Sequence, residues 1–167
     1  HLQVLRAARL VATERRGTFM QYRVADPQVA DFVVALTTLA ERRLPELQAD
    51  LREFLASREV LESVSREELL RRVQTGQVTL IDVRPAVEYA FAHMAGAVSV
   101  PLAELASWID QAPTDREIVA YCRGPYWVLA VEAVRLLRDA GYRAWRLDLG
   151  VAAWRLAGGA LQTGSVT

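Results

Sequence analysis

The sequence predicts an α/β protein with a mainly parallel sheet flanked by helices, preceded by a β-hairpin and a long helix. From residue 65 onward, short β-rich runs alternate with runs of helical period, an order typical of βα units. Before residue 65, two β-rich runs flank Arg15-Arg16-Gly17, and a long apolar repeat of helical spacing follows. The 167 residues suit one ordinary domain, or a small domain with an appendage.

The composition excludes several classes of protein. With 52% hydrophobic and 24% charged residues, the chain is globular and not disordered. Twenty arginines balance twenty acidic residues, so the net charge indicates no partner. No apolar run approaches the roughly 18 residues of a membrane helix and no signal peptide is evident, so we expect a cytoplasmic protein without a membrane partner. Because the chain starts at His1 and not at Met, we expect a longer native protein.

Residues 1–26 predict the end of a helix followed by a hairpin. Leu2 and Leu5 share one helical face, and strands are expected at residues 10–14 and 18–24 on either side of the Arg-Arg-Gly tip. Within residues 1–25, five arginines stand against Glu14 alone, so this edge is basic. A basic edge either contacts nucleic acid or is simply solvated, and the sequence leaves both alternatives open.

The second region predicts a long helix. Asp26 is expected as its N-cap and Pro27 as its first residue. Apolar residues then recur at spacings of three and four as far as Leu55, and Pro45 is expected to kink or split the helix. Such a helix spans about 45 Å, and a 26-residue fragment is too small to bury its apolar face. We therefore expect a homodimer through residues 27–57.

Residues 65–162 predict alternating helices and strands. A capping box at Ser65–Glu68 begins a helix that Gly76 ends. The expected strands are 78–83, 97–100, 117–121 and 144–147, and the other expected helices are 85–92, 102–111 and 128–140.

The single cysteine, Cys122, follows the predicted strand 117–121 and precedes a loop and a helix. One cysteine excludes an internal disulfide and any metal site with several cysteines. Ligands bind beyond the carboxyl ends of parallel strands, and loop N–H groups with a helix N-terminus add positive potential there. We therefore expect a nucleophilic thiol with a pKa below the usual value of about 8.5. The alternative is a small buried hydrophobe, and position alone does not decide between the two.

Four segments, in this order, resemble rhodanese domains. They are a D-x-R…E-[FY] segment at Asp82, Arg84, Glu88 and Tyr89, an H-[IM]-x-G-A…[IV]-P segment from His93 to Pro101, the active-site strand with its cysteine at Val119–Arg123, and a closing L-x-x-G-x-x-x-W element at Leu147–Trp154. The resemblance covers about residues 64–162 and implies a rhodanese-like domain at 65–162.

Rhodaneses carry sulfane sulfur as a cysteine persulfide, so the resemblance implies sulfurtransferase chemistry at Cys122 with a sulfur donor, a thiol acceptor and no cofactor. The implied active-site loop is Arg123, Gly124, Pro125, Tyr126, Trp127 and Val128. It departs from the common C-[RK]-x-G-x-R pattern because Trp127 replaces the Arg that would hold anionic thiosulfate. The absence of Arg at Val128 argues against the phosphatases that share this fold.

The other motif residues also have structural interpretations. Asp82 and Arg84 more often hold the end of a sheet through hydrogen bonds than take part in chemistry. Arg84 and Glu88 are four residues apart and could simply pair. His93 has no other ligand-type residue near it in sequence, so we expect a structural or capping role and no metal.

The first region resembles the ArsR-type winged-helix repressors. Residues 1–11 are similar to the H-L-x-x-L-x-x-A-G-L-V that ends their recognition helix, the hairpin to their wing, and the long helix to their dimerisation helix. The resemblance implies a truncated winged helix at 1–57, a linker at 58–64, a tail at 163–167, and DNA binding in the full-length protein. In this chain we expect only weak contact through Arg15, Arg16 and Arg23, because most of the base-reading helix is missing.

The sequence therefore favours rhodanese-type sulfur transfer, or sensing of sulfur species, through a Cys122 persulfide within an ArsR-like transcriptional regulator. Either Cys122 turns over between donor and acceptor, or it is modified once and alters DNA affinity. The remaining alternative is a regulator whose rhodanese domain is a non-catalytic interaction or sensing module.

Overall fold

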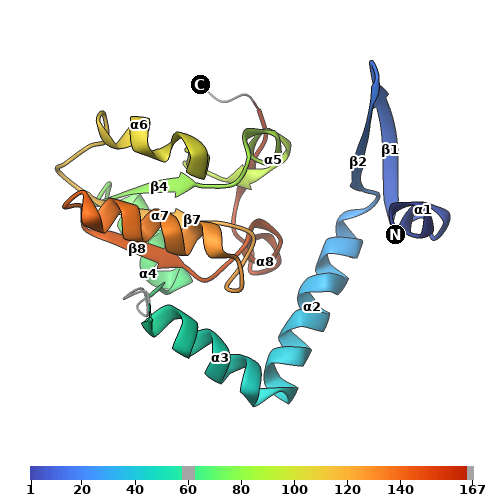
Figure 1. Cartoon of the computed structure of the whole chain (residues 1–167), viewed down its shortest axis with the longest axis horizontal. Helices are drawn as coiled ribbons and strands as arrows, with labels where there is room; N and C mark the ends of the chain where they lie inside the picture. Colours follow the sequence, from blue (N-terminus) through green and yellow to red (C-terminus); the bar gives the residue numbers. More distant parts are fainter. Residues whose placement is uncertain (58–62, 165–167) are drawn as a thin grey trace. The chain divides into compact units, whose positions relative to one another are not determined.

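The computed structural model describes residues 1–57 and 63–164 (Figure 1). The chain forms two compact units, His1–Pro45 and Glu46–Thr167. Residues 46–57 thus group with the second unit, whereas the sequence placed them in the first. The predicted linker lies mostly outside the described residues, as does the end of the predicted tail. Within the described ranges, no helix combines the length and apolar character needed to cross a membrane.

The first unit is a short helix, a hairpin and a longer helix. Its elements are α1 (Leu2–Ala7), β1 (Val11–Arg16), β2 (Phe19–Val24) and α2 (Pro27–Arg43). Arg15 pairs with Met20 and Arg16 with Phe19, so both arginines lie within β1 and the tip is Gly17-Thr18, not Arg-Arg-Gly. The left-handed backbone of Gly17, with φ of 62°, explains why glycine stands in that turn. The predicted cap at the start of α2 is confirmed, since Asp26 accepts a 2.7 Å hydrogen bond from the Gln28 N–H.

Pro45 splits the predicted long helix in two. α2 ends at Arg43, Leu44 leaves the helical conformation, and α3 (Pro45–Ala56) begins immediately afterwards. The two helices have different surroundings. Leu55 of α3 is buried in the core of the second unit, with Leu51 and Phe54 packed against that core. In α2, Phe32, Val33, Leu36 and Leu39 are each more than half exposed.

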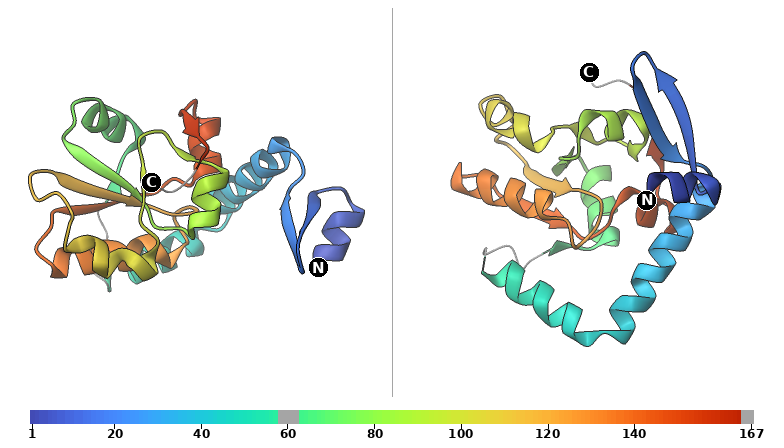
Figure 2. Two further views of the ribbon diagram at one scale, coloured as in Figure 1. Left: turned by 90° about the horizontal axis from the view of Figure 1, so that it is seen from above. Right: turned by 45° about the vertical axis from the view of Figure 1, so that its right-hand side comes forward.

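The second unit is a five-stranded parallel sheet with helices on both faces (Figures 1 and 2). The strand order is β3-β8-β7-β4-β6, and a small antiparallel pair, β5-β9, lies beside it. The strands are β3 (Ser63–Val64), β4 (Val78–Asp82), β5 (His93–Met94), β6 (Val98–Ser99), β7 (Glu117–Tyr121), β8 (Ala144–Leu147) and β9 (Leu161–Gln162). The helices are α4 (Arg66–Gln74), α5 (Ala86–Phe91), the 3₁₀ helix η1 (Leu102–Glu104), α6 (Leu105–Ile109), α7 (Val128–Asp139) and α8 (Val151–Leu156).

Two core clusters cover the two faces of the sheet. On one face, Ile118 and Ala120 of β7 pack with side chains of α3, α6 and α7. On the other face, Val119 and Tyr121 pack with α4, α5 and α8. This alternation follows from the two-residue period of a strand, and it buries β7 on both sides. The predicted α/β fold is confirmed, and it brings the carboxyl ends of β4, β7 and β8 to one edge.

The packing of α3 makes a prediction about stability. Truncating Leu55 to Ala is expected to lower the free energy of unfolding of the second unit by about 2–4 kcal/mol, because it leaves a cavity in a closed cluster. Chemical denaturation measures this change. As the control, Val87→Ala on the exposed surface of α5 should change the stability by less than about 0.5 kcal/mol. Equal effects of the two substitutions would contradict the placement of α3 in this core.

Candidate functional site

Cys122 lies directly after β7, at the edge where the parallel strands end. Its side chain is 1% exposed and belongs to the core cluster that also holds Leu55. The chain then turns through residues 123–127 and enters α7, with Trp127 as the residue before the helix. Within the loop, the Trp127 N–H donates to the Gly124 carbonyl over 3.3 Å. The strand, loop and helix therefore lie in the order that the sequence predicts.

The structure contradicts the predicted low pKa of Cys122. Burial raises the pKa of this thiol above its usual value, because the surrounding core disfavours the charged thiolate. The backbone N–H and the guanidinium of Arg123 act in the opposite direction, but burial has the larger effect. The sequence argument weighed the loop N–H groups and the helix N-terminus and did not weigh desolvation by the core. Burial therefore favours the neutral thiol over the thiolate.

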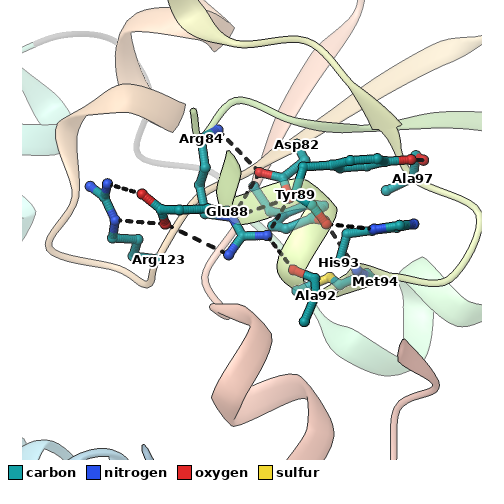
Figure 3. A network of polar contacts seen from close by, with 10 residues as sticks. Asp82, Arg84, Glu88, Tyr89, Ala92, His93, Met94, Ala97 and Arg123 are labelled. Atoms are coloured by element: carbon teal, nitrogen blue, oxygen red, sulfur yellow. Dashed lines mark hydrogen bonds and ion pairs between the residues drawn. The ribbon is translucent and has the colours of Figure 1, made fainter. Parts of the chain in front are cut away.

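Asp82 and Arg84 form a buried pair at the end of β4 (Figure 3). The Asp82 carboxylate accepts hydrogen bonds from Arg84 Nε at 2.9 Å and from the Arg84 backbone N–H at 3.1 Å. Arg84 Nη2 also donates to the Ala92 carbonyl at 2.7 Å. Arg84 thereby joins the end of β4 to the end of α5. These contacts fit the structural interpretation of both residues.

Glu88 of α5 pairs with Arg123 of the loop that follows Cys122 (Figure 3). Arg123 donates to the Glu88 carboxylate from Nε, over 3.1 Å, and from Nη2. Arg84 Nη1 is farther from the same carboxylate, at 3.8 Å. On the loop side, the Arg123 guanidinium carbon lies 4.4 Å from the centre of the Trp127 ring. The expected Arg84–Glu88 pair is therefore the weaker of two, and the stronger links α5 to the loop.

His93 is buried, with 5% of its surface exposed. Its Nδ1 lies 2.8 Å from the Tyr89 carbonyl oxygen, which requires a proton on Nδ1, and its ring stacks on the Tyr89 ring at 3.7 Å. The Tyr121 hydroxyl beside it accepts a hydrogen bond from the Met94 N–H over 3.1 Å. These contacts fit a structural role. Nowhere in residues 1–57 and 63–164 do three His, Cys, Asp or Glu side chains gather to hold a metal ion.

The remaining predicted residues occupy the loop rim and the other unit. Tyr126, Trp127 and Val128 are exposed, while Gly124 and Pro125 are half-buried. Arg15, Arg16 and Arg23 are exposed on the hairpin of the first unit. The structure brings Asp82, Arg84, Glu88 and the Cys122 loop together, and His93 supports them through Tyr89.

The closing turn after β8 supports the loop in a way that the sequence analysis did not assign. A Cβ atom at Gly150 would collide with the carbonyl group of Arg123, so this position needs glycine for the two backbones to approach. Arg146 is buried and forms an ion pair with Asp148, two residues before that glycine. The L-x-x-G-x-x-x-W pattern contains Gly150 and could have indicated its role. The buried position of Arg146 could have been suspected only because a charged residue stands inside a predicted strand.

Comparison with known proteins agrees with this geometry. Residues 65–157 match the family model of the Rhodanese-like domain. An HTH-type transcriptional regulator of Mycobacterium tuberculosis is 44% identical over 158 residues, which cover 95% of this chain and 69% of that protein. A sulfurtransferase of Allochromatium vinosum is 29% identical over 97 residues, covering 57% of this chain and 89% of that protein.

Solved structures agree at the level of the fold. The rhodanese-like domain of an Anabaena protein superimposes with a TM-score of 0.53 and 30% identity, covering 60% of this chain and 78% of that one. Residues 65–157, which match the family model, include strands β4, β6, β7 and β8 of the parallel sheet, Cys122 with its loop, and the closing Gly150 turn. The chain belongs to the rhodanese-like domain family.

Proposed function

We propose that Cys122 accepts a sulfur atom and holds it as a persulfide, in a protein that regulates transcription. The main observation behind this proposal is the position of Cys122, which is buried, directly follows a buried parallel strand and begins the loop that leads into α7. The similarity to a sulfurtransferase supports the chemistry, and the similarity to an HTH-type regulator over most of the chain supports the regulatory role.

The proposed transfer is a displacement at sulfur. The Cys122 thiol gives up its proton to solvent, and Sγ attacks the outer sulfur of a donor such as thiosulfate. A new S–S bond forms at Sγ, the donor S–S bond breaks, and its electron pair leaves with sulfite. Backbone N–H groups of the loop are suited to stabilise the terminal sulfur anion, as an oxyanion hole stabilises oxygen. A thiol acceptor then takes that sulfur and regenerates Cys122, or the persulfide persists as a signal.

The first unit supports the regulatory half of the proposal. Its hairpin carries the exposed Arg15, Arg16 and Arg23, which suit contacts to DNA phosphates. Phe32, Leu36 and Leu39 of α2 recur at i, i+4 and i+7, so they share an exposed apolar face suited to a second copy of the chain. We infer that this unit has an ArsR-type winged-helix arrangement.

Sulfur loading tests the proposal directly. After incubation with thiosulfate, polysulfide or an organic persulfide, intact mass spectrometry should show a gain of about 32 Da, one sulfur atom, that a thiol acceptor removes. Cys122→Ser should gain nothing under the same conditions. A wild-type chain that stays unmodified with all three donors would contradict sulfur transfer and sensing, and would leave the non-catalytic module as the function.

The raised pKa of Cys122 predicts the pH dependence of its reactivity. Only the thiolate reacts, so the rate of alkylation by iodoacetamide should still be rising above pH ~8.5 in the folded protein. The same cysteine in denaturant is the control, and it should titrate at the ordinary value because it is solvated. A folded-state midpoint at or below that of the denatured chain would show that the loop outweighs burial.

The α2 face predicts the oligomeric state. We expect a homodimer at micromolar concentration, and Leu36→Glu should give a monomer because it places a charge in the apolar face. Phe91→Glu on α5 makes the same change at another exposed apolar position and should leave the dimer intact. Sedimentation velocity measures the mass of each form. A monomeric wild type, or dissociation by both substitutions, would count against this interface.

A further inference from the structure

The charged groups around Cys122 are already paired with one another. Those that act on its pKa are Asp82, Arg84 and Arg123. Arg84 donates hydrogen bonds to the Asp82 carboxylate and to the Ala92 carbonyl. Arg123 is committed to Glu88 through both Nε and Nη2. An arriving anion therefore meets two guanidinium groups that both have carboxylate partners.

Of the two pairs, the Arg123–Glu88 pair is the accessible one. The Arg123 and Glu88 side chains are 32% and 31% exposed, whereas those of Arg84 and Asp82 are 8% and 0% exposed. Exposed pairs contribute little stability and are exchanged readily, while breaking a buried pair is costly. Arg123 is thus the cation that a ligand could recruit, and Glu88 is the group it would have to displace.

The geometry of the Arg123–Glu88 pair matches the geometry of anion binding. A guanidinium presents two parallel N–H groups, and a carboxylate takes them with two oxygens, as the oxygens of a sulfonate or thiosulfate group would. Glu88 takes both of these donors from α5, and Trp127 lies over the guanidinium from the loop (Figure 3 shows the two bonds). The carboxylate therefore occupies the two Arg123 N–H donors that an anionic sulfur donor would use.

We propose that Glu88 determines donor specificity: its carboxylate occupies Arg123 and so disfavours strongly anionic sulfur donors relative to organic persulfides. The inference rests on the proposed persulfide chemistry at Cys122. Thiosulfate must both displace Glu88 and approach its negative charge. An organic persulfide, R–S–SH, needs no guanidinium: Sγ bonds to its outer sulfur, the S–S bond of the persulfide breaks, and the electron pair leaves on the thiolate R–S⁻.

The experiment compares the loading rate of Cys122 by thiosulfate and by thioglycerol persulfide, followed by intact mass. Glu88→Gln should raise the ratio of the thiosulfate rate to the thioglycerol persulfide rate roughly tenfold, the usual worth of freeing one charged hydrogen-bond partner. The second donor also reports that the variant site is folded. Adding Arg123→Met to Glu88→Gln should abolish the gain, because the freed cation is then absent.

Asp115→Asn is the matched control. Asp115 pairs with Arg116 on the exposed surface just before β7, so its replacement removes the same charge at the opposite end of that strand. An unchanged ratio of the two rates in Glu88→Gln would overturn the inference, as would an equal gain in Asp115→Asn or a gain that survives Arg123→Met. Loading by thioglycerol persulfide in these same samples would leave the proposed function standing. Failure of both donors on every form would overturn that function and this inference with it.

Discussion

Parallel pairing of β4, β7 and β8 is the constraint on which the second unit depends. A sheet buried on both faces accepts mainly apolar side chains along its strands, so polar groups collect where the strands end. Asp82 ends β4 in register with Tyr121 of β7, and Cys122 comes next along the chain. Loops that follow the strands supply backbone N–H groups at this same edge. The chemistry of the site is therefore placed by the sheet and adjusted by the loops.

Burial and reactivity oppose each other at Cys122. The core cluster that fixes this residue also raises its pKa, so the free thiolate is disfavoured. In the persulfide that we propose, the negative charge lies on the terminal sulfur, one bond beyond Sγ. A site that penalises charge on Sγ therefore penalises the loaded form less than the activated form. This difference is consistent with the proposal that Cys122 holds sulfur as a persulfide.

Local patterns in the sequence predicted much of the fold and part of the candidate site. Pro45 split the helix, Asp26 capped α2, and the strands around Cys122 appeared where β-branched runs predicted them. Each of these features depends on a few neighbouring residues. Other features depend on residues that are distant in sequence. These features are the packing of α3 with the second unit, the pKa of Cys122 and the ion-pair partner of Arg123. Glu88 and Arg123 are 35 positions apart, and no periodicity relates them.

The packing of Leu55 has a practical consequence for domain dissection. The family match covers residues 65–157, but the hydrophobic core of the second unit also includes α3. A fragment cut to the family boundaries would lack Leu51, Phe54 and Leu55, and would expose the apolar side chains that they cover. It would also lack β9, the partner strand of β5, which carries His93. The compact unit in the structure is consequently larger than the family match, and it begins at the break between α2 and α3.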